Sequence, residues 1–324
     1  MEMPRYTGVL CDVPGFRLGH DEDPQAMTGV SVVLPPAGTV GGVDVRGAAP
    51  GTRETDLLKP ENWVKEVHAV TLSGGSAFGL AAADGVMRFL REKEIGLEVG
   101  AGRVPIVPGC VLFDLWIGDA KAYPDAESGF RAAAKATACD VSMGNIGAGC
   151  GATVGKLRGF GSTMKSGLGQ AAMKRGDLIV SCVVAVNAVG DVVDPFRGNE
   201  PIAGLRTADG LARSDTMKEI LSGETLPLGA DNTTIAVVAT NAKLQKAGCL
   251  RVAQMAHDGY ARAIRPVHTM SDGDTIFCLA SGEVEADINL IGIMAAEVIA
   301  KGIVNAAMMA ERSKGLPAYR DLVK

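Results

Sequence analysis

Hydrophobic positions occur in short runs, which are typical of strands, and in a few longer runs, which are typical of helices. Residues 29–52 alternate apolar and small residues between Gly and Pro and indicate two or three strands with tight turns. Residues 67–96 predict a strand, a Gly-rich turn and a helix. Residues 178–195 predict a strand hairpin that turns at residues 188–190.

The second half of the chain contains the clearest pattern. Residues 198–228 are polar and Gly-rich and predict a flexible surface segment. Then follow a β-branched strand at 233–242, an Ala-rich helix at 243–264, a turn and strand at 272–281, and a final apolar helix at 286–313. Strands come in antiparallel groups without steady alternation with helices. The pattern therefore favours an α+β sandwich, two face-to-face sheets with helices outside, over a doubly wound sheet.

Composition excludes several classes of protein. The formal net charge is −5, and no block of Lys and Arg suggests a nucleic-acid surface. No uncharged apolar run reaches about 18 residues, so we expect no membrane span. The first 15 residues lack the order of a signal peptide, and a cytoplasmic location is expected. The seven Cys and four His form neither a C-x-x-C nor an H-E-x-x-H motif, so we expect no metal and no cofactor.

Three motifs suggest other chemistries and fail on spacing. Gly74 and Gly75 are adjacent, so the turn lacks the G-x-G-x-x-G spacing of a dinucleotide site. The loop before Leu157 lacks the first Gly and the Ser or Thr of a P-loop. Ser162 and Lys165 match the S-x-x-K of penicillin-recognising hydrolases, but the S-D-N and K-T-G motifs that accompany it are missing.

Two polar features leave alternatives open. Lys156 lies among glycines, where its ammonium either approaches a substrate or is simply exposed to solvent. Asp272 and Asp274 stand just before a strand. They either form an ordinary Asp-Gly-Asp turn or point into one cleft and bind an ammonium group.

Two hydroxyl residues occupy the start of the strand at 233–242, directly after Asp231 and Asn232. Asn and Thr are common at the entry of a strand, which is one explanation. The other is that the chain is cut before Thr233 and that this residue becomes a nucleophile.

Seven motifs in order resemble one family from about residue 8 to residue 310. They read CDVPGFRLGH, TLSGGSAFGLAAADGV, PIVPGCVLFDL, GAGCGATVGKL, VAVNAVGDVVDP, DNTTIAVVATNA and DGDTIFCLAS. Together they are similar to the self-processing D-aminopeptidases, β-peptidyl aminopeptidases and nylon-oligomer hydrolases, which form peptidase family S58 of the N-terminal nucleophile type.

The resemblance implies a four-layer αββα sandwich with two stacked, mainly antiparallel sheets flanked by helices. Residues 1–324 would form one such domain, cut between Asn232 and Thr233 into chains of residues 1–232 and 233–324. The resemblance also implies a homo-oligomer, a tetramer or larger.

The chemistry of such a cut can be argued from the residues. A Thr hydroxyl is a poor nucleophile unless a base is close. An N-terminal Thr carries its own base, because an α-amine has a reference pKa of about 7.7–8.0. Before the cut that nitrogen is an amide without useful basicity. Attack of the Thr233 hydroxyl on the Asn232 carbonyl, an N-to-O acyl shift and hydrolysis of the ester would therefore create the catalyst.

The resemblance assigns roles to five further residues. Asn187 would donate to the oxyanion, and Lys156 would keep the nucleophile reactive. Asp272 and Asp274 would orient the new amine and, in aminopeptidases, bind the ammonium group of the substrate. Phe113 would line the substrate cleft. Two Asp with a Thr nucleophile resemble the nylon-oligomer hydrolases more than the Ser-dependent aminopeptidases.

We therefore predict a self-processed amide hydrolase that acts through an acyl-enzyme on small peptides or amino-acid amides. One alternative is an acyltransferase of the ornithine acetyltransferase type, which would use the same nucleophile. The other is an uncut, non-catalytic binding protein.

Overall fold

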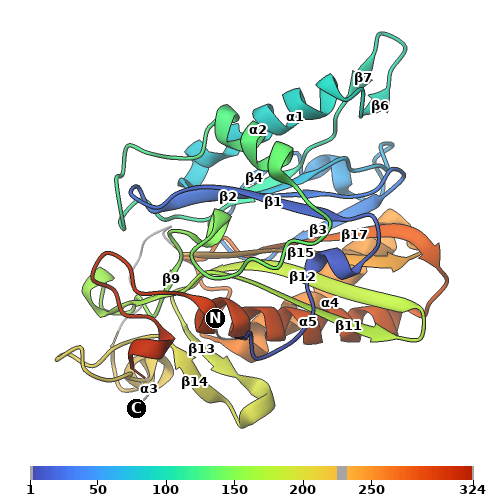
Figure 1. The fold of residues 1–324 in the computed structure, drawn as a ribbon. Coiled ribbons are helices and arrows are strands. Elements are labelled where there is room, and N and C mark those ends of the chain that lie inside the picture. Colours follow the sequence, from blue (N-terminus) through green and yellow to red (C-terminus); the bar gives the residue numbers. More distant parts are fainter. Residues whose placement is uncertain (1–2, 225–231, 323–324) are drawn as a thin grey trace.

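The computed structural model describes residues 3–224 and 232–322. Two five-stranded sheets lie face to face, and a pair of helices covers the outer face of each sheet (Figure 1). The strand order is β1-β2-β5-β8-β4 in the first sheet and β11-β12-β15-β17-β3 in the second. These layers confirm the predicted αββα sandwich.

Most strand pairs of the two sheets are antiparallel, and only β5–β8 and β15–β17 are parallel among the described pairs. The first sheet contains β1 (Arg17–Asp23), β2 (Thr28–Leu34), β5 (Val70–Ser73), β8 (Gly109–Val111) and β4 (Gly51–Arg53). The second contains β11 (Leu168–Arg175), β12 (Leu178–Asn187), β15 (Thr233–Ala242), β17 (Thr275–Val284) and β3 (Val40–Val45).

The sandwich has three apolar layers. The first layer lies between the two sheets, where Leu72 of one sheet and Val237 of the other are fully buried in the same apolar cluster. Outside the first sheet lie α1 (Ala82–Glu92) and α2 (Ala126–Lys135), and outside the second lie α4 (Lys246–Ala263) and α5 (Ile288–Met309). Every residue of β15 is buried, because this strand is central in its sheet and is covered on both faces.

Helix α5 confirms the apolar helix predicted at 286–313, and it is largely buried. Among the described residues it is the one helix with the length and apolar composition that a membrane span requires. In the structure, 78% of its apolar window is buried inside the protein, against β11, β12 and α4. Its hydrophobicity is explained by its place in the core.

The predicted hairpin at 178–195 was wrong. β12 ends at Asn187, and β13 (Asp191–Asp194) belongs to a separate sheet with β14 (Glu200–Ala203) and β16 (Ile264–Arg265). Both edges of β12 are already paired, with β11 and β15, so β13 cannot pair with it. Residues 155 and 156 donate to the carbonyls of Gly190 and Val189 in the connection between the two strands. The short strands β6 (Leu97–Glu98) with β7 (Arg103–Val104), and β9 (Thr153–Val154) with β10 (Met164–Lys165), complete the described strands.

Part of the segment predicted to be flexible is built into the fold. It contains β14 and a short helix, α3 (Thr216–Leu221), and its residues 225–228 lie outside the described part of the chain. Asp191 connects the two, because its carboxylate accepts from the main-chain N–H groups of Leu205 and Thr216, both at 2.7 Å. Polar residues of this segment therefore serve internal hydrogen bonds.

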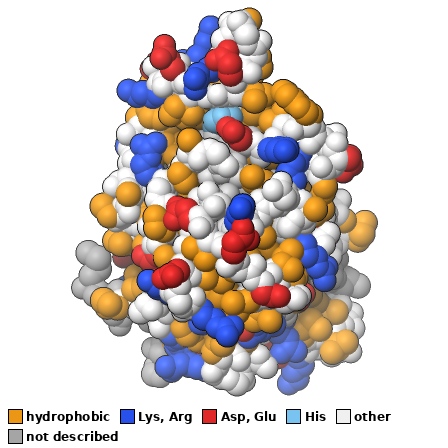
Figure 2. All heavy atoms as spheres, turned by 90° about the vertical axis from the view of Figure 1, so that its right-hand side faces the viewer, with side chains coloured by type: hydrophobic (Ala, Val, Ile, Leu, Met, Phe, Trp, Pro, Cys, Tyr) orange, Lys and Arg blue, Asp and Glu red, His pale blue; other side chains and the backbone are white. Residues whose placement is uncertain are grey.

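The face shown in Figure 2 carries both signs of charge. Acidic and basic side chains are interspersed there with scattered apolar ones. This distribution differs from the single-signed stripe that phosphate backbones require.

Candidate active site

Thr233 is the first residue of β15 and lies directly opposite Asn187, the last residue of β12. Both are buried, at 5% and 0% exposure. Residues that face each other in an antiparallel pair extend their side chains to the same side of the sheet, with Cβ atoms about 4.5–5.5 Å apart. Strand pairing thus brings the Asn187 amide to the Thr233 hydroxyl.

The main chain at Gly273 completes the surroundings of this hydroxyl. The Gly273 N–H lies 3.2 Å from Thr233 Oγ1 and 3.1 Å from the Asn232 carbonyl oxygen. The Thr233 hydroxyl itself contacts the same carbonyl oxygen. A nucleophile, the carbonyl group before it and one hydrogen-bond donor therefore meet at one point.

The Asn187 side chain is held in one orientation. Its Oδ1 accepts from Lys156 Nζ at 2.8 Å and from the Thr153 N–H at 3.0 Å. Its Nδ2 donates to the Phe113 carbonyl oxygen at 2.8 Å. Because the acceptor side faces Lys156 and Thr153, the amide nitrogen is the atom on the side of the Phe113 carbonyl, and its NH₂ group is the hydrogen-bond donor of this side chain.

The loop that carries Lys156 runs along the end of β12. Lys156 N donates to the Val189 carbonyl at 3.0 Å, and its ammonium reaches the Asn187 carbonyl at 3.2 Å. Gly155 has a φ of +75°, and a Cβ there would lie 2.0 Å from the Gly204 carbonyl carbon. Glycine is required at this position for the loop to approach the neighbouring chain so closely.

Asp272 and Asp274 flank Gly273 and are both 1% exposed. The Asp272 carboxylate accepts from the Thr269 N–H at 2.8 Å and from the Thr269 hydroxyl at 2.7 Å. Burial raises the pKa of Asp272 above its usual range, and the neighbouring charge of Asp274 raises it further. The pair is therefore buried at the start of β17, beside the start of β15.

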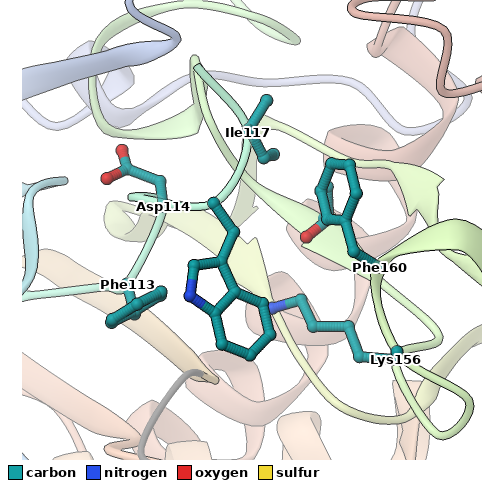
Figure 3. Close-up of a pocket in the computed structure, with 8 residues that line it drawn as sticks. Phe113, Asp114, Ile117, Lys156 and Phe160 are labelled. Carbon is teal, nitrogen blue, oxygen red and sulfur yellow. The ribbon is translucent and has the colours of Figure 1, made fainter. Parts of the chain in front are cut away.

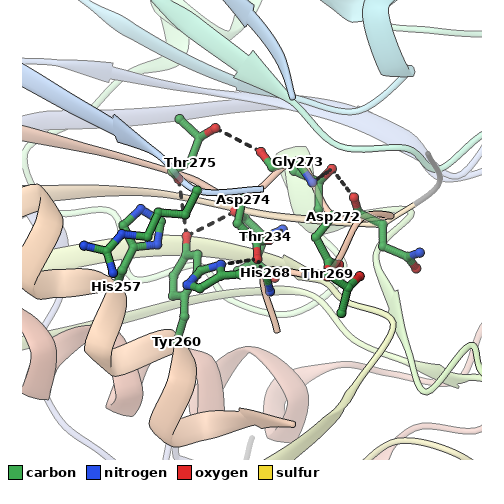
Figure 4. A network of polar contacts seen from close by, with 12 residues as sticks. Thr234, His257, Tyr260, His268, Thr269, Asp272, Gly273, Asp274 and Thr275 are labelled. Carbon is green, nitrogen blue, oxygen red and sulfur yellow. Dashed lines mark hydrogen bonds and ion pairs between the residues drawn. The ribbon is translucent and has the colours of Figure 1, made fainter. Parts of the chain in front are cut away.

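Asp274 is tied to the first residues of β15. Its Oδ1 accepts from the Thr234 N–H at 2.7 Å, and its Oδ2 lies 2.8 Å from His268 Nδ1 (Figure 4). The Tyr260 hydroxyl donates to the Thr234 carbonyl at 3.2 Å. The Asp274 carboxylate therefore contacts the N–H of Thr234, the residue that follows Thr233.

An apolar pocket opens beside Lys156 and Thr153 (Figure 3). It encloses about 480 Å³ of space that is open to solvent. Phe113, which was predicted to line the substrate cleft, is in its wall. The other lining residues are Asp114, Trp116, Ile117, Gly159 and Phe160. A small molecule with an apolar body fits such a pocket, while Lys156 connects the pocket to Asn187.

The S-x-x-K residues do not form a catalytic pair. The Ser162 hydroxyl donates to the Gly159 carbonyl at 2.9 Å. Lys165 is fully buried and donates to the carbonyls of Gly149, Ala152 and Ser166 at 3.2, 2.9 and 2.5 Å. Burial lowers the pKa of Lys165 to about 7. This lysine therefore stabilises the loop before Thr153 through its bonds to the Gly149 and Ala152 carbonyls.

All of the residues predicted from the sequence for the site lie in one cluster, and their roles stay predictions. Three further groups were missed: the Gly273 N–H, Thr153 and His268. A main-chain N–H cannot be recognised from a residue type, because nearly every residue has one. Thr153 lies in a Gly-rich segment where no motif singles it out. In residues 3–224 and 232–322, no three His, Cys, Asp or Glu side chains converge as metal ligands. The predicted residues in this cluster are Phe113, Lys156, Asn187, Asn232, Thr233, Asp272 and Asp274.

Comparisons with known proteins identify the family of the chain. A family model described as "Peptidase family S58" matches residues 9–319. An uncharacterized aminopeptidase of Mycobacterium tuberculosis (strain ATCC 25618 / H37Rv) is 44% identical and aligned over 97% of both chains. A 6-aminohexanoate-oligomer endohydrolase of Paenarthrobacter ureafaciens is 31% identical over 87% of this chain and 78% of its own.

Solved structures share the fold. A beta-aminopeptidase of Burkholderia sp. superposes with a TM-score of 0.70 at 22% identity, over 98% of this chain and 92% of the other. The L-aminopeptidase D-Ala-esterase/amidase of Ochrobactrum anthropi, described as a new variant among the Ntn hydrolase fold, gives a TM-score of 0.67 at 16% identity. That match covers 96% of this chain and 89% of the other. At these identities the likeness concerns the arrangement of the chain.

Proposed function

The chain belongs to peptidase family S58 and is a hydrolase of amide bonds, and we propose that it cuts itself before Thr233 and then uses this residue as its nucleophile. Its substrates would be small peptides, amino-acid amides or short oligoamides. The observation that carries the proposal is the meeting of the Thr233 hydroxyl, the Asn232 carbonyl and the Gly273 N–H.

Self-cleavage begins when Thr233 Oγ1 attacks the Asn232 carbonyl carbon. Negative charge then develops on the Asn232 oxygen, and the Gly273 N–H, 3.1 Å away, stabilises it. The C–N bond breaks as the acyl group moves to the hydroxyl oxygen and the nitrogen takes up a proton. Water hydrolyses the ester, which leaves a carboxylate on Asn232 and a free amine on Thr233.

The free amine is the general base of the second reaction. Its reference pKa of about 7.7–8.0 leaves a useful neutral fraction at neutral pH. Asp272 and Asp274 lie on the strand entry beside it and would hold this amine by charge. The amine accepts the proton of the Thr233 hydroxyl as that oxygen attacks the substrate carbonyl, and it passes this proton to the substrate nitrogen as the C–N bond breaks and the amine product leaves. Water then hydrolyses the ester of the acyl-enzyme, which frees the acid product and restores the hydroxyl.

Asn187 and Lys156 would support the same step from the opposite strand. Asn187 lies directly opposite Thr233, and its NH₂ group, which donates to the Phe113 carbonyl, would donate to the substrate oxyanion together with the Gly273 N–H. Lys156 fixes the Asn187 amide through a 2.8 Å bond to Oδ1 and adds a positive charge to the site. The apolar pocket with Phe113 would hold the body of the substrate.

A denaturing gel of the purified protein tests the proposal. We expect two fragments, the smaller beginning Thr-Thr-Ile, and hydrolysis of an amino-acid p-nitroanilide. Thr233→Ala should abolish both. Thr234→Ala is the matched control, because this neighbouring Thr is equally buried and its hydroxyl has no hydrogen-bond partner among the described residues. Hydrolysis by a preparation that mass spectrometry shows to be uncut would refute the proposal.

A further inference from the structure

Asp274 is held from two sides by N–H donors. Oδ1 accepts from the Thr234 N–H at 2.7 Å. Oδ2 accepts from both N–H groups of His268, the main chain at 3.2 Å and the ring Nδ1 at 2.8 Å (Figure 4). A carboxylate oxygen is an acceptor, so we assign the ring nitrogen in this contact as the donor, Nδ1–H. With both oxygens engaged, the plane of the carboxylate is fixed.

The backbone of His268 adopts a left-handed conformation, which is uncommon for residues other than glycine. Its φ is +57°, in the left-handed region. A residue with a side chain in this region costs free energy that the surrounding structure must offset. The conformation has a visible result, because it directs both the main-chain N–H and the ring Nδ1 of one residue at the same carboxylate oxygen.

Neighbouring rings keep the imidazole of His268 in place. The His257 ring packs edge-on at 4.9 Å between centroids, and the Tyr260 ring lies 5.9 Å away. Tyr260 is itself fixed by bonds from its hydroxyl to the carbonyls of Thr234 and Thr275, at 3.2 and 3.3 Å. Burial lowers the pKa of His257 to about 3, so this neighbour is neutral and does not repel the His268 ring. The ring cluster therefore connects His268 rigidly to the starts of β15 and β17.

Packing alone does not explain a histidine here. Its Nε2 is buried, and among the described residues it has no hydrogen-bond partner. A buried polar atom without a partner costs about 1–3 kcal/mol. An apolar ring would fill the same space without that cost, so the reason for histidine must lie in its other nitrogen, the one that meets Asp274.

We propose that His268 is a positioning residue of the hydrolase, which through Nδ1–H fixes the Asp274 carboxylate at the Thr234 N–H, one residue after the Thr233 nitrogen. The inference rests on the proposed function, because it concerns the amine that the cut creates. His268 touches neither the nucleophile nor the pocket in the described contacts, so it acts through Asp274. Its loss should lower kcat and the rate of self-cleavage while leaving KM nearly unchanged.

Three substitutions separate the hydrogen bond from the ring. His268→Asn keeps an N–H donor near the place of Nδ1, and Asn tolerates a left-handed backbone better than most residues. His268→Gln moves the donor outward, and His268→Leu removes it. Relative to wild type, we expect Asn within about threefold in kcat, and Gln and Leu reduced about 10- to 100-fold, the range found for outer partners of functional ligands in metal sites. His68→Gln, the same change far from the site, should leave kcat unchanged.

A second background shows whether His268 acts through Asp274. In an Asp274→Asn protein, adding His268→Leu should change the remaining rate by less than about threefold, because the interaction is already lost. A full additional loss would overturn the proposal. So would equal activity of the Asn and Gln variants, at wild-type level or far below it, in proteins whose thermal unfolding matches wild type.

The wild-type protein separates this proposal from the proposed function. If wild type yields no fragment that begins at Thr233, the proposed function fails, whatever His268 does. If wild type is cut and the Gln variant cleaves and hydrolyses at the wild-type rate, the proposed function stands and the role of His268 is refuted. The rate of self-cleavage in freshly synthesised protein is measured beside kcat, so a variant that matures slowly still gives a result.

Discussion

Replacing Asn187 by Asp removes a hydrogen-bond donor with almost no change in shape. The Asp side chain keeps an acceptor for Lys156 Nζ and the Thr153 N–H, which bind Oδ1 at 2.8 and 3.0 Å. It has no N–H for the Phe113 carbonyl or for the oxyanion. Removal of one oxyanion donor lowers kcat about 10²- to 10³-fold, or about 2.7–4 kcal/mol. Because the new carboxylate also stands where negative charge develops, we expect a loss of at least about 10²-fold.

The chain provides a matched control at the other end of β15. Asn241 is 4% exposed, its Nδ2 donates to the Asp177 carbonyl at 2.8 Å, and its Oδ1 accepts from the Ile179 N–H at 2.9 Å. Asn241→Asp therefore loses the same kind of bond to a main-chain carbonyl, which costs about 1–3 kcal/mol of stability. Its kcat should equal that of wild type.

The assay is steady-state hydrolysis of an amino-acid p-nitroanilide, with kcat divided by the fraction of chains cut at Thr233. Thermal unfolding of both variants is measured in the same buffer. The expected result is a similar loss of stability in Asn187→Asp and Asn241→Asp, with a loss of kcat in the first alone. A kcat for Asn187→Asp within tenfold of wild type would show that Asn187 only ties two strands to the loop, and the oxyanion role would be wrong.

Two further predictions test the loop and the nucleophile's surroundings. In Gly273→Ala the new methyl would lie 2.7 Å from Thr233 Oγ1 and 2.7 Å from the Ala49 carbonyl oxygen. Displacement of the hydroxyl by about 1 Å can cost about 10²-fold, so a gel time course should show cleavage slowed by that order, and unaltered cleavage would contradict the geometry. Burial lowers the pKa of Lys165 to about 7, against about 10.4 in the unfolded chain, so between these values the unfolded state binds more protons and the free energy of unfolding rises with pH. Urea unfolding at several pH values should show a smaller rise in Lys165→Met, and equal slopes would count against a buried amine of low pKa.

The fold was largely predictable where one principle decided the structure. The strand at 233–242 and the helices at 243–264 and 286–313 are apolar enough that burial determines both their type and their place. β1 was missed because its sequence, RLGHDED, is mostly polar. Its buried Asp21 accepts from Arg131 and Lys135 of α2. A polar residue is buried in this strand because of a tertiary salt bridge, and the strand therefore lacks the apolar alternation that would predict it.

The residues of the candidate site could be proposed from the sequence, but the contacts that connect them could not. Thr233, Asn187 and the two aspartates could be found because their residue types suit the reaction and their motifs occur in a known order. The Gly273 N–H could not, because every residue except proline has one. His268 could not be found either, because its proposed role depends on its positive φ and on a contact with the carboxylate of Asp274, six residues later.

The position of Gly273 connects the two reactions of the proposed cycle. In the uncut chain its N–H already lies 3.1 Å from the carbonyl oxygen that self-cleavage would charge. After the proposed cut, the Asn232 carbonyl would become part of a separate chain end, and the carbonyl of a substrate would take its place against the same N–H. The N–H also lies 3.2 Å from the Thr233 hydroxyl, at the start of a strand buried on both faces, so neither partner needs to move between the two reactions. The Gly273 N–H that is preorganised for the proposed self-cleavage is thereby also preorganised for each later substrate. A substitution that displaces this N–H should therefore slow self-cleavage and substrate hydrolysis together.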